Sequence, residues 1–276
     1  MKHRLILILI LVFSQTWLVR AQNIRETSTL YGIGNVSLKN IYLSPLSYSG
    51  ISGKFFKETM HHGVWHNDLL VVQNLRHVDL GYTHNKAENN NTLYIDALWG
   101  KNVLYRYDFN EQLKLYFGGG LDINGGLMYN LRNGNNPVAV SLNSNVNMSA
   151  VAEWTVHISD YPVKIKGQMN IPLLGVAFSP KYGQSYYELF TLDNGSGSVK
   201  FTSIHNNVTA RYMLSAFLPI GKAALQLGYA GNIVQTQLNN IESTVYNHSF
   251  VIGYAKKIQL ISYKKKKTDG KAVRYY

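Results

Sequence analysis

The group of residues best suited to chemistry is Ser149, Glu153 and His157, which offer a hydroxyl, a carboxylate and an imidazole at intervals of four residues. A hydrolytic triad requires such side chains to lie within hydrogen-bond reach of one another. On one extended strand, residues four apart are separated by ~13 Å, so these three cannot form a triad alone. His157 or His205 could serve as a base only beside a serine of a neighbouring strand, and neither is surrounded by a lipid-hydrolase motif.

The sequence HHGVWH places His61, His62 and His66 close together. A metal site would need neutral imidazoles that converge on one ion, and the nearby carboxylates are Glu58 and Asp68. We therefore predict a solvated turn at the end of a strand here, and we expect no metal site and no cofactor.

A further set of charged residues shares the polar face of the predicted strands. Two interpretations of this set remain open: a charged constriction that selects anions in a pore, or a salt-bridged plug that fills a narrow lumen. The second is favoured because open channels need about sixteen strands, whereas barrels near eight are filled by side chains. The set comprises Asp122, Arg132, Glu153, Lys164, Lys166 and Arg211.

The elements that carry these residues show apolar and polar positions in strict alternation. Residues 138–158 alternate over their whole length. A period of two predicts strands, because successive side chains point to opposite faces. The same pattern recurs in residues 112–130, 163–173, 204–218, 223–233 and 246–254, and it is less regular near 28–38, 50–60, 68–83 and 93–107.

The predicted connections alternate in length along the chain. Those at 108–111, 159–162 and 219–222 are short, whereas those at 40–49, 84–91, 130–137, 174–197 and 235–243 are longer or rich in Asn and Gly. Short turns at one end and longer loops at the other are typical of outer-membrane barrels. We predict an all-β, transmembrane, antiparallel up-and-down barrel of ten strands, with twelve as the alternative.

The polar face of these strands is rich in Asn and Ser rather than in Lys and Glu. Such a face suits a crowded lumen, with the apolar face turned to lipid. A membrane barrel also pairs every backbone group within the protein, as the bilayer requires. We therefore expect residues 22–263 to form the barrel, with lipid of the outer membrane as its surroundings.

Both ends of the chain are basic. Residues 1–21 combine MKHR with the apolar run LILILILVF, a pattern that predicts a cleaved signal peptide. Residues 264–276 begin with KKKK and are predicted to be a solvated basic tail. The ends contribute most of the net charge of +12, and the nearly neutral body argues against a nucleic-acid partner. The absence of cysteine excludes disulfides and thiolate metal sites.

Several segments resemble a family of uncharacterised barrel proteins from Gram-negative anaerobes, which is catalogued as a domain of unknown function. They are YLSPLSYSG (42–50), GGLMYNLRNGNNP (125–137), IPLLGVAFSPKYGQSYYELF (171–190) and HSFVIGYAKKIQL (248–260). The resemblance spans nearly all of the mature chain and implies an outer-membrane barrel. It implies no reaction, ligand or catalytic residue.

The connection 175–197 is the longest and carries several aromatic residues. It either folds back over the mouth of the barrel, binds another envelope protein or contributes an extra hairpin. We expect a non-enzymatic outer-membrane barrel with a structural or surface-interaction role, with or without a narrow solute path. The alternative is a hydrolase or acyltransferase that acts on membrane lipid, with His157 or His205 as the base.

Overall fold

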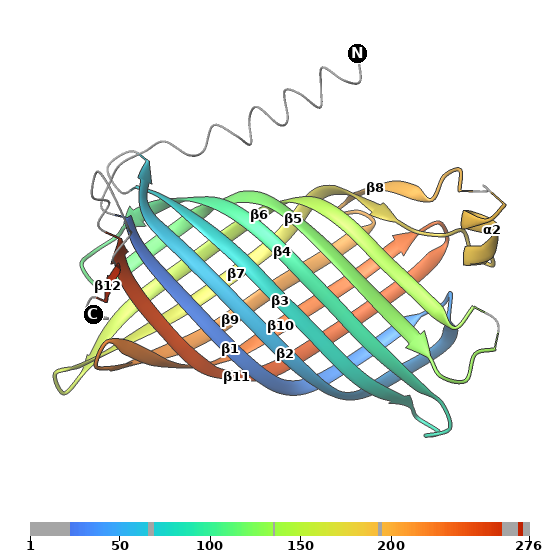
Figure 1. The fold of residues 1–276 in the computed structure, drawn as a ribbon, viewed down its shortest axis with the longest axis horizontal. Helices are drawn as coiled ribbons and strands as arrows, with labels where there is room; N and C mark the ends of the chain where they lie inside the picture. The colour runs from blue at the N-terminus through green and yellow to red at the C-terminus, as the bar shows by residue number, and fades with distance from the viewer. Residues whose placement is uncertain (1–22, 66–68, 135, 193–194, 261–269, 273–276) are drawn as a thin grey trace, which may run out of the picture.

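The computed structural model describes residues 23–65, 69–134, 136–192, 195–260 and 270–272. Long antiparallel strands form one sheet in sequence order, and the sheet closes because β1 pairs with β11 along its whole length (Figure 1). The ten strands of the barrel are β1 (Asn23–Asn40), β2 (Ser44–Trp65), β3 (Leu70–Asn85), β4 (Asn91–Asp108), β5 (Leu113–Asn130), β6 (Val138–Ile158), β7 (Tyr161–Phe178), β9 (Asn207–Ile220), β10 (Ala223–Leu238) and β11 (Ile241–Leu260).

Three short elements accompany the barrel. The strand β8 (Val199–Ser203) pairs with β7, the strand β12 (Gly270–Ala272) pairs with the end of β11, and α2 (Tyr186–Phe190) is a single helical turn. Neither short strand enters the closed ring, so the prediction of ten strands is confirmed. In the described ranges, no helix has the length and apolar character needed to cross a membrane.

The longest connections lie at one end of the barrel, but the predicted sorting by length is incomplete, because two connections at that same end are short turns. The segments 40–49 and 235–243 were expected as loops, whereas the structure has turns only at 41–43 and 239–240. Asn239 and Asn240 both have positive φ, 49° and 63°, which suits a two-residue hairpin turn. We call the end with turns 109–112, 159–160 and 221–222 the short-turn end, and the opposite end, which carries α2, the cap end.

The strands expose their apolar face and enclose their polar face. On β6, Val146 is 48% exposed, whereas the next residue back, Asn145, is 2% exposed. Leu214 on β9 is likewise 59% exposed. The predicted inversion, with apolar residues outward and amides inside, is confirmed.

The barrel wall changes its pairing partly along β7. The segment Lys164–Asn170 pairs with β9, and the segment Leu174–Phe178 pairs with β8. Between them lies Pro172, which has no N–H to donate to a ladder. The register with β6 also shifts at this height, between Val146 and Asn147. The ladder along this edge of β7 is therefore interrupted at residues 171–173, between the segment paired with β9 and the segment paired with β8.

The lumen is narrow and filled. Apolar clusters alternate with polar groups along it, the central cluster including Leu30, Phe56 and Met213. Glycines on the inner face make room for this packing: at Gly126, a Cβ would lie 2.6 Å from the Ser141 hydroxyl and 3.0 Å from Asp96 Oδ2. A side chain there would displace a group of the polar interior.

Candidate functional site: the charged lumen

The lumen near the short-turn end holds a layer of ion pairs that joins opposite walls. Lys166 on β7 is 1% exposed, and its Nζ lies 2.7 Å from Glu58 Oε2 on β2. Lys164 on β7 lies 2.6 Å from Glu26 Oε1 on β1 and 3.5 Å from Glu153 Oε1 on β6. We call Glu26, Glu58, Glu153, Lys164 and Lys166 the end layer. Buried charges are tolerated when they are paired and hydrogen-bonded in this way.

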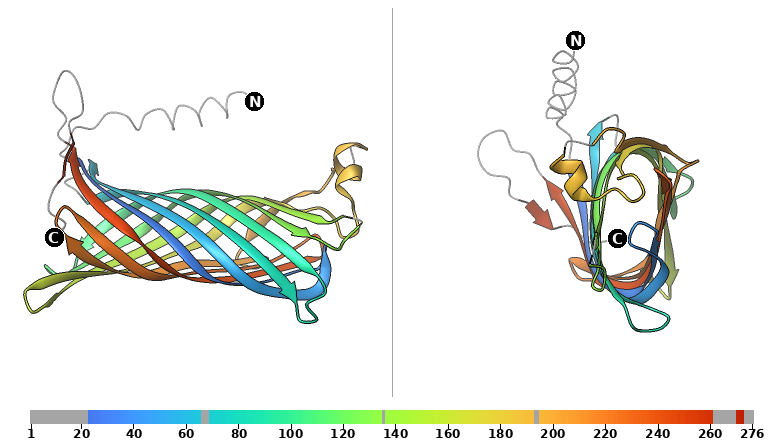
Figure 2. Two further views of the ribbon diagram at one scale, coloured as in Figure 1. Left: turned by 60° about the horizontal axis from the view of Figure 1, so that its bottom comes forward. Right: turned by 90° about the vertical axis from the view of Figure 1, so that its right-hand side faces the viewer.

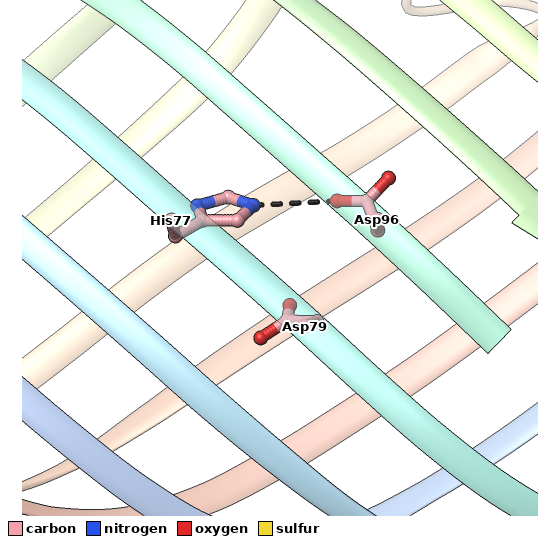
Figure 3. Close-up of side chains that lie close together, drawn as sticks. All are labelled: His77, Asp79 and Asp96. Carbon is pink, nitrogen blue, oxygen red and sulfur yellow. Dashed lines mark hydrogen bonds and ion pairs between the residues drawn. The ribbon is translucent and has the colours of Figure 1, made fainter.

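A second layer lies further along the lumen. Asp79 and Asp96 face each other across β3 and β4, and Lys54 pairs with Asp79 from β2. His77 Nε2 lies 3.3 Å from Asp96 Oδ1, as Figure 3 shows. Arg211 Nη1 of β9 reaches Asp122 Oδ2 of β5 over 3.3 Å. We call Lys54, His77, Asp79, Asp96, Asp122 and Arg211 the middle layer.

Three members of the middle layer have the chemistry of a metal site. Ligand atoms of His77, Asp79 and Asp96 all lie within 4.8 Å of one another (Figure 3). Protein groups already serve most of these atoms, since Lys54 contacts Asp79 and Asn124 donates to both oxygens of Asp96 at 2.9 Å. Asp79 Oδ2 is the buried oxygen left without a hydrogen bond. We interpret the cluster as part of the plug, because a divalent cation there would compete with Lys54.

The charges of the middle layer sum to −1 with a neutral His77 and to zero with an imidazolium, since two basic and three acidic side chains meet there. Its amides also take part: Asn145 Nδ2 donates to Asp122 Oδ1 over 2.7 Å. The arrangement is therefore a hydrogen-bonded charge network that joins several strands across the lumen. No nucleophile is placed beside His77 among the described residues.

The cavities that remain in the lumen are small. One of about 50 Å³ lies beside the middle layer and is lined by His77, Asp122 and Arg211. Another of about 160 Å³ lies at the short-turn end, lined by Glu26, Glu153 and Lys164. Spaces of this size hold a few water molecules.

The structure brings together most of the charged residues that the sequence placed on one face. Asp122, Glu153, Lys164, Lys166 and Arg211 all lie in the lumen, divided between the two layers. Arg132 does not join them. It is exposed in the connection after β5, where its Nη1 donates to the carbonyl of Asn89 over 3.1 Å. Arg132 differs because it falls just beyond the last residue of the strand, where alternation no longer sets its direction.

The two histidines considered as catalytic bases are not members of either layer. His157 is exposed near the short-turn end of β6. His205 is exposed in the turn between β8 and β9, and its Nδ1 contacts the hydroxyl of Ser203. A serine is therefore in reach of one histidine. In the described part of the chain, however, no carboxylate contacts His205, so the pair lacks the group that would orient the base of a triad.

The solvated turn predicted at His61 and His62 is wrong, because β2 continues through both residues to Trp65, and these two imidazoles do not converge. His61 and His62 are successive residues of β2 and point to opposite faces. His62 faces the lumen, with its ring centroid 6.2 Å from that of Tyr116. His66 lies outside the described residues.

Sequence reasoning missed His77, Asp79 and Asp96, which lie in the part of the chain where the alternation is less regular. A pattern was nevertheless present, since His77 and Asp79 are two residues apart and must share a face of β3. The pairing of Asp79 with Asp96 depends on the register of β3 and β4.

A family model described as a protein of unknown function, DUF3316, matches residues 4–265. The chain belongs to the DUF3316 family. A comparison of the sequence with curated proteins gave no match.

Solved structures show which architecture this DUF3316 protein shares. The outer membrane protease OmpT from Escherichia coli is 8% identical, with a TM-score of 0.52 over 88% of this chain and 100% of that one. The translocator domain of the autotransporter NalP from Neisseria meningitidis is 10% identical, with a TM-score of 0.41 over 92% of this chain and 94% of that one. The likeness to OmpT shows the fold alone: a closed, transmembrane, antiparallel β-barrel of ten strands.

The cap end of the DUF3316 barrel is an ordered structure. The described residues 180–192 and 195–198 lie at one side of the mouth, with α2 at the rim (Figure 2). The Tyr42 hydroxyl donates to the Gln184 carbonyl over 2.7 Å, and the Val140 N–H donates to the Tyr186 hydroxyl over 2.7 Å. A capping box at Ser185 and Glu188 begins the helix. We call residues 180–198 the cap.

The cap presents large apolar side chains to the outside. Tyr187 is 65% exposed and Phe190 is 74% exposed, whereas Leu189 between them is buried. Tyr182 and Leu192 are also more than half exposed. Exposed aromatic groups of this kind usually mark contacts. The predicted extra hairpin is found in part, since β8 pairs with the outer end of β7.

Proposed function

We propose that this protein is a non-enzymatic barrel of the outer membrane whose lumen is closed to solutes and whose cap meets a partner at the cell surface. The observation that carries this proposal is the ion pair between Lys166 and Glu58, which spans the lumen from β7 to β2 at 2.7 Å. The Arg211–Asp122 pair crosses the lumen again in the middle layer. An open pore would require the ion pairs of both layers to break.

The outer membrane is supported by the apolar exterior and the closed sheet together. The exposed faces of β5 and β6 carry large apolar residues along their length, including Phe117, Leu121, Val146 and Trp154. Such an apolar surface is suited to lipid. A closed barrel, like a helix, can cross the hydrocarbon core because all its backbone N–H and C=O groups are hydrogen-bonded within the protein. The longer connections at the cap end then face outward, and the short turns face the periplasm.

Conductance in planar lipid bilayers tests the closed lumen. We expect no stable unit conductance from the wild-type protein. Replacement of Glu58, Lys164 and Lys166 by alanine removes the end layer and is expected to give a measurable ion current. Lys57→Ala is the matched control, because Lys57 is on β2 but faces outward. Stable single-channel openings of the wild type would contradict the proposal.

The orientation of the cap has its own test, because the chain has no cysteine. A cysteine at Phe190 is expected to react with a membrane-impermeant maleimide on intact cells. A cysteine at Lys222, in a turn at the short-turn end, is expected to react only after the cells are permeabilised. The reverse pattern would place the cap in the periplasm.

The contact between Ser203 and His205 is the one observation that favours a lipid hydrolase. Both residues lie in or beside an exposed turn, and neither contacts a carboxylate among the described residues. We therefore expect no release of fatty acid from phospholipid vesicles by the purified protein. Hydrolysis that is lost in Ser203→Ala would replace the non-enzymatic proposal with the enzymatic one.

A further inference from the structure

The outer face of β1–β4 carries a group of cations near the short-turn end. Lys57 on β2 lies directly opposite Arg76 on β3. Lys101 on β4 lies opposite Asn74, the next outward residue of β3. Arg25 on β1 lies opposite His61 on β2. We call Arg25, Lys57, Arg76 and Lys101 the basic patch.

The cations of the basic patch have no ion-pair partner in the part of the chain that the structure describes. In the described ranges, none of the four forms an ion pair, whereas Lys54, Lys164 and Lys166 in the lumen all do. The carboxylates of β1–β3, such as Glu26, Glu58 and Asp79, are buried in the lumen. Like charges directly opposite each other on neighbouring strands are destabilising. An anion bound at the patch would relieve that repulsion.

One cation of the patch is held close to the wall. Arg25 Nε is buried and has no hydrogen-bond partner among the residues that the structure describes. An orphaned guanidinium donor of this kind is costly unless something outside the protein accepts its hydrogen bond. The patch thus offers both charge and an unused donor.

On β1 and β3 the patch lies on the short-turn side of the large exposed apolar residues, whereas Lys101 on β4 lies among them, with Val103 and Tyr105 exposed beyond it. On β1 the large exposed apolar residues are Tyr31 and Ile33, and Arg25 follows toward the short-turn end. On β3 they are Leu80 and Tyr82, and Arg76 follows in the same direction. Long basic side chains at such a boundary extend their charge toward the headgroup region.

The residues between the cations are neutral hydrogen-bonding groups. Thr27, Thr59 and Asn74 form one cross-strand row, which ends at Lys101. Cations with hydroxyl and amide groups between them suit a phosphate, because guanidinium and ammonium groups make charge-assisted hydrogen bonds to its oxygens. The position selects a phosphate attached to a lipid.

The rest of the wall offers no comparable group. The outward residues of β5, β7 and β9, such as Leu121, Met169 and Leu214, are apolar, and in the described strands from β5 to β10 no charged side chain shares that face. Charge is therefore confined to one side of the barrel.

We propose that the basic patch binds the headgroup of an anionic phospholipid in the periplasmic leaflet. This inference rests on the proposed membrane location, and it concerns a surface that the closed lumen and the cap do not use. Each cation near an anionic lipid surface contributes on the order of 1 kcal/mol, so two substitutions are expected to weaken binding about thirtyfold.

Native mass spectrometry of the purified full chain tests the inference, with phosphatidylglycerol and phosphatidylcholine as competing probes. We expect the wild type to retain phosphatidylglycerol in preference. Lys57→Gln combined with Arg76→Gln is expected to lose that preference. Lys86→Gln combined with Lys222→Gln removes the same charge from turns at the two ends and is expected to keep it.

Three results would overturn the inference: equal retention of both lipids by the wild type, equal loss in the two double variants, or a change of oligomeric state in the patch variant without a change in lipid retention. Heat-modifiable migration on gels shows separately whether each variant is a folded barrel. A protein that fails to insert into bilayers contradicts the proposed function, whereas an inserted barrel without lipid preference contradicts this inference alone.

Discussion

Lys54 and Lys57 lie three residues apart on β2, in opposite surroundings. Lys54 is 7% exposed in the lumen and pairs with Asp79. Lys57 faces outward, opposite the cation Arg76. The difference shows that this barrel uses one residue type for two purposes. Inside the barrel, Lys54 has an ion-pair partner within the chain. Outside, Lys57 is one of the cations that we propose to contact anionic lipid.

The contrast between lumenal and outward-facing lysines predicts its largest effect on stability when a paired lumenal lysine is removed. Lys166→Met leaves Glu58 buried without its counter-ion, and we expect a loss of about 3–5 kcal/mol in the free energy of unfolding. Urea unfolding in lipid vesicles measures this loss. Lys166→Met combined with Glu58→Met is the control and is expected to be close to wild type. A full effect in the double variant would show that packing, rather than charge, explains the loss.

An unpaired cation placed in the apolar wall should cost somewhat less. Val146 is 48% exposed near the middle of β6. We expect Val146→Arg to destabilise the barrel by about 2–4 kcal/mol, because the guanidinium then faces hydrocarbon. Lys57→Arg, at the edge of the apolar belt, is the matched control. Equal stability of the two variants would show that the wall of β6 does not face lipid.

The cap provides a third case, in which a neutral group, the Tyr42 hydroxyl, makes the contact that holds the cap to the barrel. Burial, followed by the nearby Tyr186 and Glu188, raises the pKa of Tyr42 from 10.0 to about 12. The contribution of Tyr42 to the attachment of the cap is thus complete below pH 10 and is lost as the pH rises through 12. Tyr42→Phe is expected to weaken the attachment by about 1 kcal/mol. The difference in phenolate absorbance between wild type and variant should titrate near pH 12; a midpoint near 10 would contradict the burial of the Tyr42 hydroxyl under the cap.

The smallest effect is expected at the outer lysine itself. Lys57→Gln removes a cation without a protein partner, so the free energy of unfolding in neutral lipid should change by no more than about 0.5 kcal/mol. Unfolding by urea in phosphatidylcholine vesicles is the measurement. A loss as large as that of Lys166→Met would mean that Lys57 has a structural partner and would remove the contrast with Lys54.

The sequence predicted the barrel where each strand has one apolar and one polar face. The strand expected at 138–158 is found as β6 with the same bounds. Prediction was weaker for β1–β3, because these strands bury Leu30 and Phe56 in the lumen and expose Lys57 and Arg76. Such strands have apolar residues on both faces, so the period of two is less visible.

The charged lumen was predicted as a face but not as pairs. Alternation shows that Lys166 points inward, but its partner Glu58 lies 108 residues away on the opposite wall. The choice of partner depends on strand tilt and register, which no short segment of sequence fixes. The basic patch depends on register in the same way, since Lys57 and Arg76 meet only through the pairing of β2 with β3.

The interruption at Pro172 makes the wall unequal in mechanical strength. The other pairs of long strands are joined over most of their length, although some have register shifts, whereas β7 is joined to β9 only from Lys164 to Asn170. When the barrel is stretched or heated, we therefore expect the pairing of β7 with β9 to open before the other strand pairs do.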